Sequence, residues 1–211
     1  MPRPVTLFTG QWADLPLETV AQKASEWGYD GLELASWGDH FDVMRAAKDK
    51  AYCDERRALL KKYNLQVFAF SIHLIGQLVG DEPLDERHDQ FVGPDLKGKY
   101  DKMREYAIEF CMAAPAAAKN LGVQVVTGFT GSPIWHLWFP FPPQVPAQVE
   151  AGYRRFADRW NPIMDEFGKH GIKFGLEVHP GEIAYDFYSA ERTLEAIGRR
   201  PEFGINFDPS H

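Results

Sequence analysis

Two short apolar runs in this sequence end in carboxylate and imidazole side chains. They are GLEVHPGE at residues 175–182 and GINFDPSH at residues 204–211. Apolar side chains alternate along both runs, which is typical of β-strands. Acidic residues are depleted in strands, and parallel α/β sheets hold their functional groups at the carboxyl ends of the strands. We therefore expect Glu177 and Asp208 to mark a polar site at the carboxyl edge of a parallel sheet.

The composition is that of a soluble globular protein with an acidic surface. Apolar residues make up 45% of the 211 residues and charged residues 25%, and the net charge is −7. This charge argues against a nucleic-acid groove or an anionic membrane as the main partner, because both require a basic face. The two cysteines, Cys53 and Cys111, form neither a disulfide framework nor a CxxC motif. No signal peptide or 18-residue apolar span is evident, so we expect a cytoplasmic protein.

Strand and helix patterns alternate along the whole sequence. Strands are predicted at residues 5–8, 29–35, 65–72, 123–127, 172–178 and 203–207. The helix patterns between them end in a turn residue at Gly28, Asn64, Gly122 and Gly171. This ending is the αβ-loop signature of a repeated β-α unit. Residues 74–98 are predicted as a long loop or lid, and residues 128–148 as an irregular stretch rich in proline and aromatic residues.

Six consecutive β-α units with polar strand ends favour an α/β fold of the (β/α)₈ TIM-barrel type. A doubly wound sheet is less consistent, because no glycine-rich phosphate loop follows the first strand. A complete barrel usually needs about 250 residues. We therefore expect residues 1–211 to form a single domain that holds the first six strands and is incomplete at its C-terminus.

The sequence resembles the sugar phosphate isomerase/epimerase superfamily, the xylose-isomerase-like TIM barrels. The most specific segments are LEVHPGE at 176–182 and NFDPSH at 206–211, supported by YDGLELASWGDH and SIHLIGQ. The resemblance implies one divalent metal ion with four ligands, of which Glu177 and Asp208 would be the first two and the others would lie beyond residue 211. Oxygen ligands with an imidazole suit Mn²⁺ or Mg²⁺, which we favour, or Zn²⁺.

The same resemblance implies a sugar or keto-sugar isomerase or epimerase that abstracts a proton and forms a metal-stabilised enediolate. Glu177 would be both ligand and catalytic acid/base, and His211 would contact substrate oxygens. A dehydratase or β-eliminating lyase acting on a keto-sugar or 3-keto-glycoside shares the proton abstraction and is the main alternative.

Two further alternatives are an endonuclease IV-like repair enzyme and a non-catalytic partner subunit. The repair enzyme needs three zinc ions and a basic groove, whereas the fourth strand ends in Gly128-Phe129-Thr130 without a histidine and the net charge is acidic. We expect a small-molecule sugar partner, no nucleic acid or membrane, and a homo-oligomer.

Additional substrate-binding candidates lie after the predicted strands. They are His73, His179, Glu182, Trp12, Trp37 and Trp135, with Trp138 as a further aromatic residue. Structural roles compete with each: a strand-end acid can cap a helix, a histidine can be a satisfied core residue, and Glu182 can be a solvated loop acid. The tryptophans could pack under a lid or form a subunit interface.

Overall fold

The computed structural model describes residues 3–137 and 139–211. The six strands follow the order of the sequence, β1-β2-β3-β4-β5-β6, and the pairs β1–β2, β2–β3 and β5–β6 are parallel. The chain divides into two compact units, which are described in turn. The first unit is Met1–Ile72, Ala113–Val126 and His170–Ile172, and the second is His73–Met112, Thr127–Lys169 and Lys173–His211.

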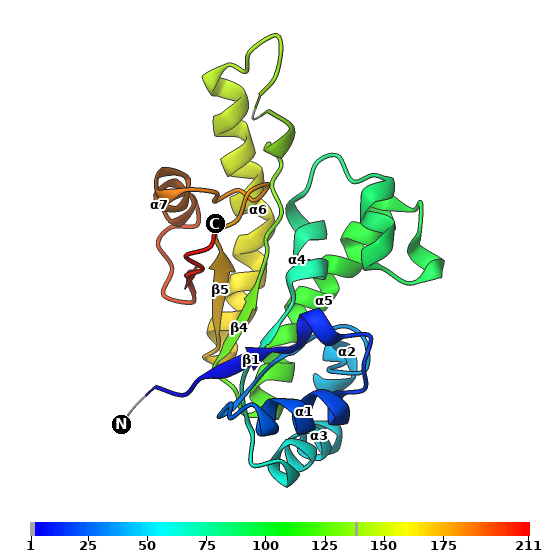
Figure 1. The fold of residues 1–211 in the computed structure, drawn as a ribbon. Coiled ribbons are helices and arrows are strands. Elements are labelled where there is room, and N and C mark those ends of the chain that lie inside the picture. The colour runs from blue at the N-terminus through cyan, green and yellow to red at the C-terminus, as the bar shows by residue number, and fades with distance from the viewer. Residues whose placement is uncertain (1–2, 138) are drawn as a thin grey trace. The chain divides into compact units, whose positions relative to one another are not determined.

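The first unit holds three parallel strands with their connecting helices (Figure 1). Its elements are β1 (Thr6–Phe8), η1 (Thr9–Trp12), α1 (Leu17–Glu26), β2 (Gly31–Ala35), α2 (Val43–Ala46), α3 (Lys50–Lys62) and β3 (Gln66–Ser71). Leu32 pairs with Leu7 on one side and with Val67 on the other. Asp49 caps α3 by accepting a hydrogen bond from Tyr52 N, as expected of an N-cap carboxylate.

The second unit contains the loops and helices that follow β3, β4 and β5. Its elements are α4 (His73–Gly80), η2 (Glu86–Phe91), η3 (Pro94–Leu96), η4 (Trp135–Leu137), α6 (Pro146–His170), β5 (Lys173–Glu177), α7 (Phe187–Ala196) and β6 (Phe203–Asn206). Three elements contribute residues to both units: α5 (Tyr100–Leu121), β4 (Val125–Gly128) and α6, whose last residue, His170, belongs to the first unit. None of the described helices is long and apolar enough to cross a lipid bilayer.

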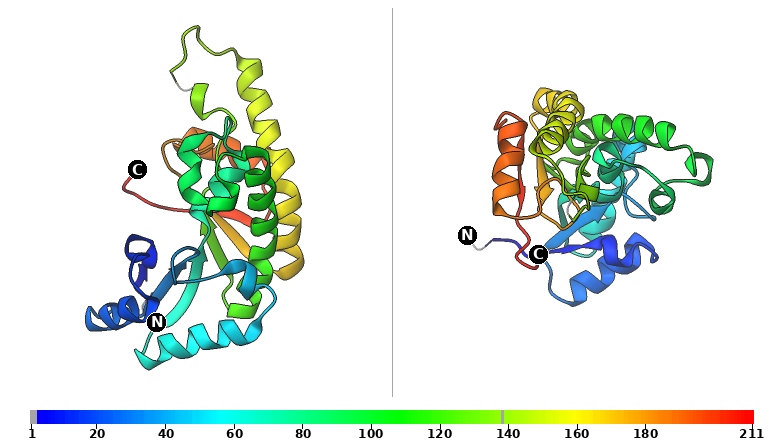
Figure 2. Two further views of the ribbon diagram at one scale, coloured as in Figure 1. Left: turned by 90° about the vertical axis from the view of Figure 1, so that its right-hand side faces the viewer. Right: turned by 90° about the horizontal axis from the view of Figure 1, so that it is seen from above.

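Helix α6 lies along β5 and buries an aromatic core (Figure 2). The ring centroids of Trp160 and Phe167 lie 5.0 and 5.9 Å from that of Phe174, and all three side chains are buried. Burying a side chain of this size contributes roughly 1.5–3 kcal/mol. This packing fixes β5 and therefore the residues at its carboxyl end.

The prediction of a loop or lid over residues 74–98 is wrong, because α4 occupies its start and two 3₁₀-helices follow. Gly76 and Gly80, which lower helix propensity, lie where α4 meets the segment after β4. A Cβ atom on Gly76 would stand 2.2 Å from Phe129 O, and one on Gly80 would stand 2.2 Å from Thr130 O. The glycines therefore let the helix backbone lie directly on residues 129–131.

The structure differs from one further expectation. Helix α6 begins at Pro146, inside the stretch predicted to be irregular. Helix α5 continues through Pro115. Helix α7 begins at Phe187, and Asp186 is its N-cap, accepting a hydrogen bond from Ser189 N.

We expect Gly76→Ala to lower the free energy of unfolding by about 1–3 kcal/mol, because the added methyl group would overlap a backbone carbonyl. The matched control is Gly93→Ala. Gly93 has φ −68°, and a Cβ placed there meets nothing within 4 Å. Urea denaturation of both variants would test the contact, and equal stabilities would contradict the close packing of α4 on the segment after β4.

Candidate functional site

Three side chains able to bind a metal ion converge in the second unit. Glu177 ends β5, and Asp208 and His211 follow β6. Each can offer a ligand atom within 4.8 Å of the other two, and His211 Nε2 lies 3.5 Å from both Glu177 Oε1 and Asp208 Oδ2. The parallel register pairs Glu177 with Asn206, which brings Asp208 to the same edge. Two carboxylates and one imidazole fit a divalent cation.

The second oxygen of Glu177 is already held by protein donors. His73 Nε2 donates to Glu177 Oε2 at 3.1 Å, and Asn206 Nδ2 donates to the same atom at 3.1 Å. The hydrogen bond from His73 lowers the pKa of the half-buried Glu177, outweighing the opposing effect of burial. Glu177 is therefore ionised at neutral pH, with Oε2 fixed and Oε1 facing His211.

Phe129 packs between two of the site's histidines. Its ring centroid lies 4.5 Å from that of His73 and 5.0 Å from that of His179, and the His179 ring lies 4.1 Å from the His211 ring. His179 Nδ1 lies 2.7 Å from Pro180 O, and donation to this carbonyl leaves Nε2 as the acceptor nitrogen.

The structure thus places His73, His179 and His211 beside Glu177 and Asp208. Neither Asn206 nor Phe129 was predicted from the sequence to be a site residue. Asn206 carries a usable signal, because a polar residue at a strand end two positions before Asp208 belongs to the same sheet edge.

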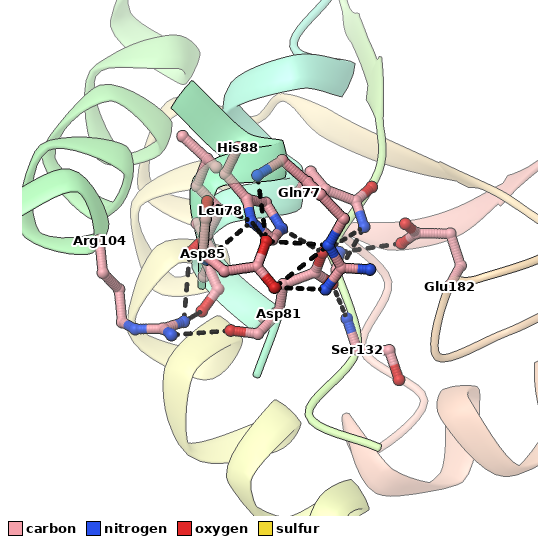
Figure 3. Close-up of polar contacts among 12 residues, drawn as sticks. Gln77, Leu78, Asp81, Asp85, His88, Arg104, Ser132 and Glu182 are labelled. Carbon is pink, nitrogen blue, oxygen red and sulfur yellow. Dashed lines mark hydrogen bonds and ion pairs between the residues drawn. The ribbon is translucent and has the colours of Figure 1, made fainter. Parts of the chain in front are cut away.

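Glu182 lies in the interior of the second unit, with 2% of its surface exposed. Its Oε2 accepts hydrogen bonds from Thr130 N at 2.8 Å, Gly131 N at 2.9 Å and Thr130 Oγ1 at 3.2 Å, as Figure 3 shows in part. Burial, followed by the nearby charge of Asp81, raises the pKa of Glu182 to about 8. The side chain therefore links the loop after β5 to the segment after β4, and it is protonated at neutral pH.

Asp81 holds the far end of the same segment. Its Oδ1 accepts from Ser132 N at 2.8 Å, and its Oδ2 accepts from His88 Nε2 at 2.9 Å (Figure 3). Arg104 donates to the backbone oxygen of Asp81 at 2.7 Å. Residues 130–132 are thus held between two buried carboxyl groups. We call Asp81, Glu182 and residues 130–132 the carboxyl clamp.

The tryptophan candidates are less closely tied to this site. Trp12 and Trp37 belong to the first unit, where they pack against Trp27 and Phe8. Trp135 lies in η4 of the second unit, with the Arg87 guanidinium 4.2 Å from the centre of its ring. Trp138 lies outside the described residues. Substrate contact by any of the tryptophans, or by Glu182, stays a prediction.

Comparison with known proteins identifies the fold. A family model described as "Xylose isomerase-like TIM barrel" matches residues 21–211. No curated protein matches the sequence. The predicted TIM-barrel type is therefore confirmed, with six parallel strands described.

Several solved structures share the fold at low sequence identity. The probable 3-DHS dehydratase AsbF from Bacillus anthracis has a TM-score of 0.63 and 19% identity, covering 97% of this chain and 62% of its own. The 3-keto-D-glucoside 4-epimerase YcjR from E. coli has a TM-score of 0.65 and 13% identity, covering 97% of this chain and 67% of its own.

A third similar structure contains a metal ion. A xylose isomerase-like TIM barrel protein from Mycobacterium smegmatis, in complex with magnesium, has a TM-score of 0.61 and 14% identity, covering 97% of this chain and 64% of its own. The chain thus spans less than two thirds of the AsbF and M. smegmatis proteins.

We expect the protein to bind about one Mn²⁺ per chain, and Asp208→Asn to weaken this binding at least tenfold, because it removes an anionic ligand. Glu105→Gln, which neutralises an exposed acid on α5, is the matched control and should change the affinity less than twofold. Calorimetric titration with Mn²⁺ measures both. Wild-type affinity in Asp208→Asn would contradict the assigned site.

We also expect Glu182 to make stability pH-dependent. Because its pKa is about 8 in the folded protein against an ordinary 4.5, its contribution is complete below pH 4.5 and is lost as the pH rises to about 8. Glu182→Gln cannot titrate, so its stability relative to wild type should increase over this range by on the order of a few kcal/mol. Urea denaturation at pH 5 and pH 8 tests this. Parallel pH profiles for wild type and Glu182→Gln would show that Glu182 is not buried as described.

Proposed function

The chain belongs to the xylose isomerase-like TIM-barrel family, and from that premise we propose that it is a divalent-metal-dependent isomerase or epimerase of a sugar or keto-sugar. The observation that carries this proposal is that the two carboxylate oxygens of Glu177 have different partners. One carboxylate oxygen is fixed by His73 and Asn206, while the other faces His211, which also lies beside Asp208. A carboxylate held in this way is suited to act at a reacting carbon.

Glu177 is the residue that moves the proton in this proposal. Its lowered pKa keeps it ionised at neutral pH, so it can accept a proton from the carbon next to a substrate carbonyl. The donors on Oε2 restrict rotation of the carboxylate and direct it towards one face of the substrate. A carboxylate of low pKa is a weak base. A bound cation would compensate by polarising the carbonyl, which would make the proton on the neighbouring carbon more acidic.

The histidines orient the substrate in this scheme. His211 Nε2 lies between the two carboxylates and can donate to a substrate oxygen. His179 Nε2 can accept from a substrate hydroxyl, because Nδ1 of that ring bonds to Pro180 O. Phe129 lies between the rings of His73 and His179 and helps to hold both in place.

We favour Mn²⁺ or Mg²⁺ over Zn²⁺ because the two residues assigned as ligands, Glu177 and Asp208, are carboxylates. The magnesium complex of the similar M. smegmatis protein is consistent with this choice. The proposed substrate class draws on YcjR, whose name describes an epimerase of a 3-keto-D-glucoside.

A lyase is the second candidate, because it begins with the same proton abstraction and then expels a leaving group from the enediolate. The similarity to AsbF, named as a probable dehydratase, supports the lyase as a candidate. The two reactions differ in product: an epimer keeps the mass of the substrate, whereas a dehydration product is lighter by one water.

We expect the protein with Mn²⁺ to exchange the α-proton of D-fructose or of methyl 3-keto-glucoside for deuterium in D₂O. Glu177→Gln should slow the exchange at least about a hundredfold, while Glu105→Gln should not. Proton NMR follows the exchange, and mass spectrometry of the product separates epimerisation from elimination. Absence of exchange in a preparation that binds Mn²⁺ would refute the proposed proton transfer.

A further inference from the structure

A cavity of about 400 Å³ lies in the second unit between the amino-terminal parts of α6 and α7. Figure 1 labels both helices. Val149 and Tyr153 of α6 form one wall, and Tyr188 and Arg192 of α7 form another. The volume lies in the range of small-molecule sites and would hold one or two rings. Neither Glu177 nor Asp208 lines it, so the cavity is separate from the metal-binding cluster.

Aromatic rings surround the opening of this cavity. Tyr188 is 79% exposed, Phe139 97% and Tyr185 42%, and all three line the cavity. The flat apolar faces of sugar rings pack well on such rings, whose edges leave the ring hydroxyls free to form hydrogen bonds. The opening therefore offers stacking surfaces on more than one side.

Two buried polar side chains line the cavity beside the buried Ile183. Glu182 and Ser132 line it, with 2% and 1% of their surfaces exposed. Oε2 of Glu182 is occupied by the donors of Thr130 and Gly131. A protonated carboxyl group offers both a donor and an acceptor, as a hydroxyl-bearing ligand requires.

The charges around the cavity do not favour an anion. Arg192 is a cationic side chain that lines the cavity. It is ion-paired with Glu150, and its guanidinium carbon lies 4.3 Å from the centre of the Tyr153 ring. The acid Asp186 also lines the cavity and caps α7. A phosphorylated ligand would meet this acid without an unpaired cation to balance it, whereas a neutral polyol meets no such penalty.

The cavity and the metal-binding cluster share the loop that follows β5. Glu177 and His179 contribute to the cluster, and Glu182 and Ile183 line the cavity. Backbone hydrogen bonds close the loop, from Glu182 N to His179 O at 3.0 Å and from His179 N to Ala184 O at 3.1 Å. A ligand in the cavity and a substrate at the cluster would thus contact opposite ends of one ordered loop.

We propose that this cavity binds an uncharged sugar ring, the non-reacting part of a glycoside whose other ring is processed at Glu177. The assignment to a glycoside rests on the proposed function, but the binding of the sugar ring does not. The protein would therefore prefer disaccharides and other glycosides, which can fill this cavity, and would bind them more tightly than free monosaccharides.

The test is calorimetric titration of the full chain with cellobiose, maltose, trehalose and D-glucose, without metal. At least one disaccharide should bind about tenfold more tightly than glucose. Tyr188→Ala should remove about tenfold of that affinity, the loss expected for one stacked ring. Phe141→Ala is the matched control, because Phe141 is 97% exposed but does not line the cavity. It should change the affinity less than twofold.

Three outcomes would overturn the proposal. They are equal binding of glucose and every disaccharide, equal effects of Tyr188→Ala and Phe141→Ala, and a shift in oligomeric state in Tyr188→Ala without a change in sugar binding. The last would identify the aromatic face as a subunit contact. Because neither metal nor turnover enters the titration, failure of the proposed proton transfer would leave its result unchanged.

Discussion

The candidate site depends on how the backbone after β4 is held. The carboxyl clamp fixes residues 130–132 from two sides, and the glycine face of α4 lies against the carbonyls of Phe129 and Thr130. Phe129 is thereby kept between His73 and His179, and His73 in turn holds one oxygen of Glu177. The orientation of His73 thus depends on backbone contacts that lie outside the candidate metal-binding cluster.

The clamp is built from groups that are costly to bury, and its hydrogen bonds explain why it is tolerated. A buried carboxyl group without partners would be strongly destabilising. Glu182 avoids this by accepting three hydrogen bonds and remaining protonated at neutral pH. Asp81 accepts from Gln77, Ser132 and His88. Removing any one donor would leave a buried oxygen short of a partner, which is why such networks fix a single arrangement of the chain.

The strand ends could be predicted from sequence, whereas the clamp could not. Alternation of apolar residues locates β5 and β6, and the parallel pairing rule then brings Glu177 and Asp208 together. The partners of Glu182 in the clamp lie 52 residues away at Thr130, so no local pattern reports them. Helix α4 was missed because Gly76 reads as a turn residue, although close contact with another backbone segment is its role.

The loop after β5 carries two carboxyl groups whose environments drive their pKa values apart. Glu177 is half-buried and hydrogen-bonded by His73, which lowers its pKa, whereas Glu182 is buried near Asp81, which raises its pKa to about 8. At neutral pH one is a charged group suited to metal and proton chemistry, and the other is a neutral structural group. Ionisation of Glu182 above pH 8 would place a second negative charge beside Asp81 and weaken the clamp. Weakening of the clamp above pH 8 would loosen the packing around Phe129, whereas Glu177, already ionised, would keep its charge over that range.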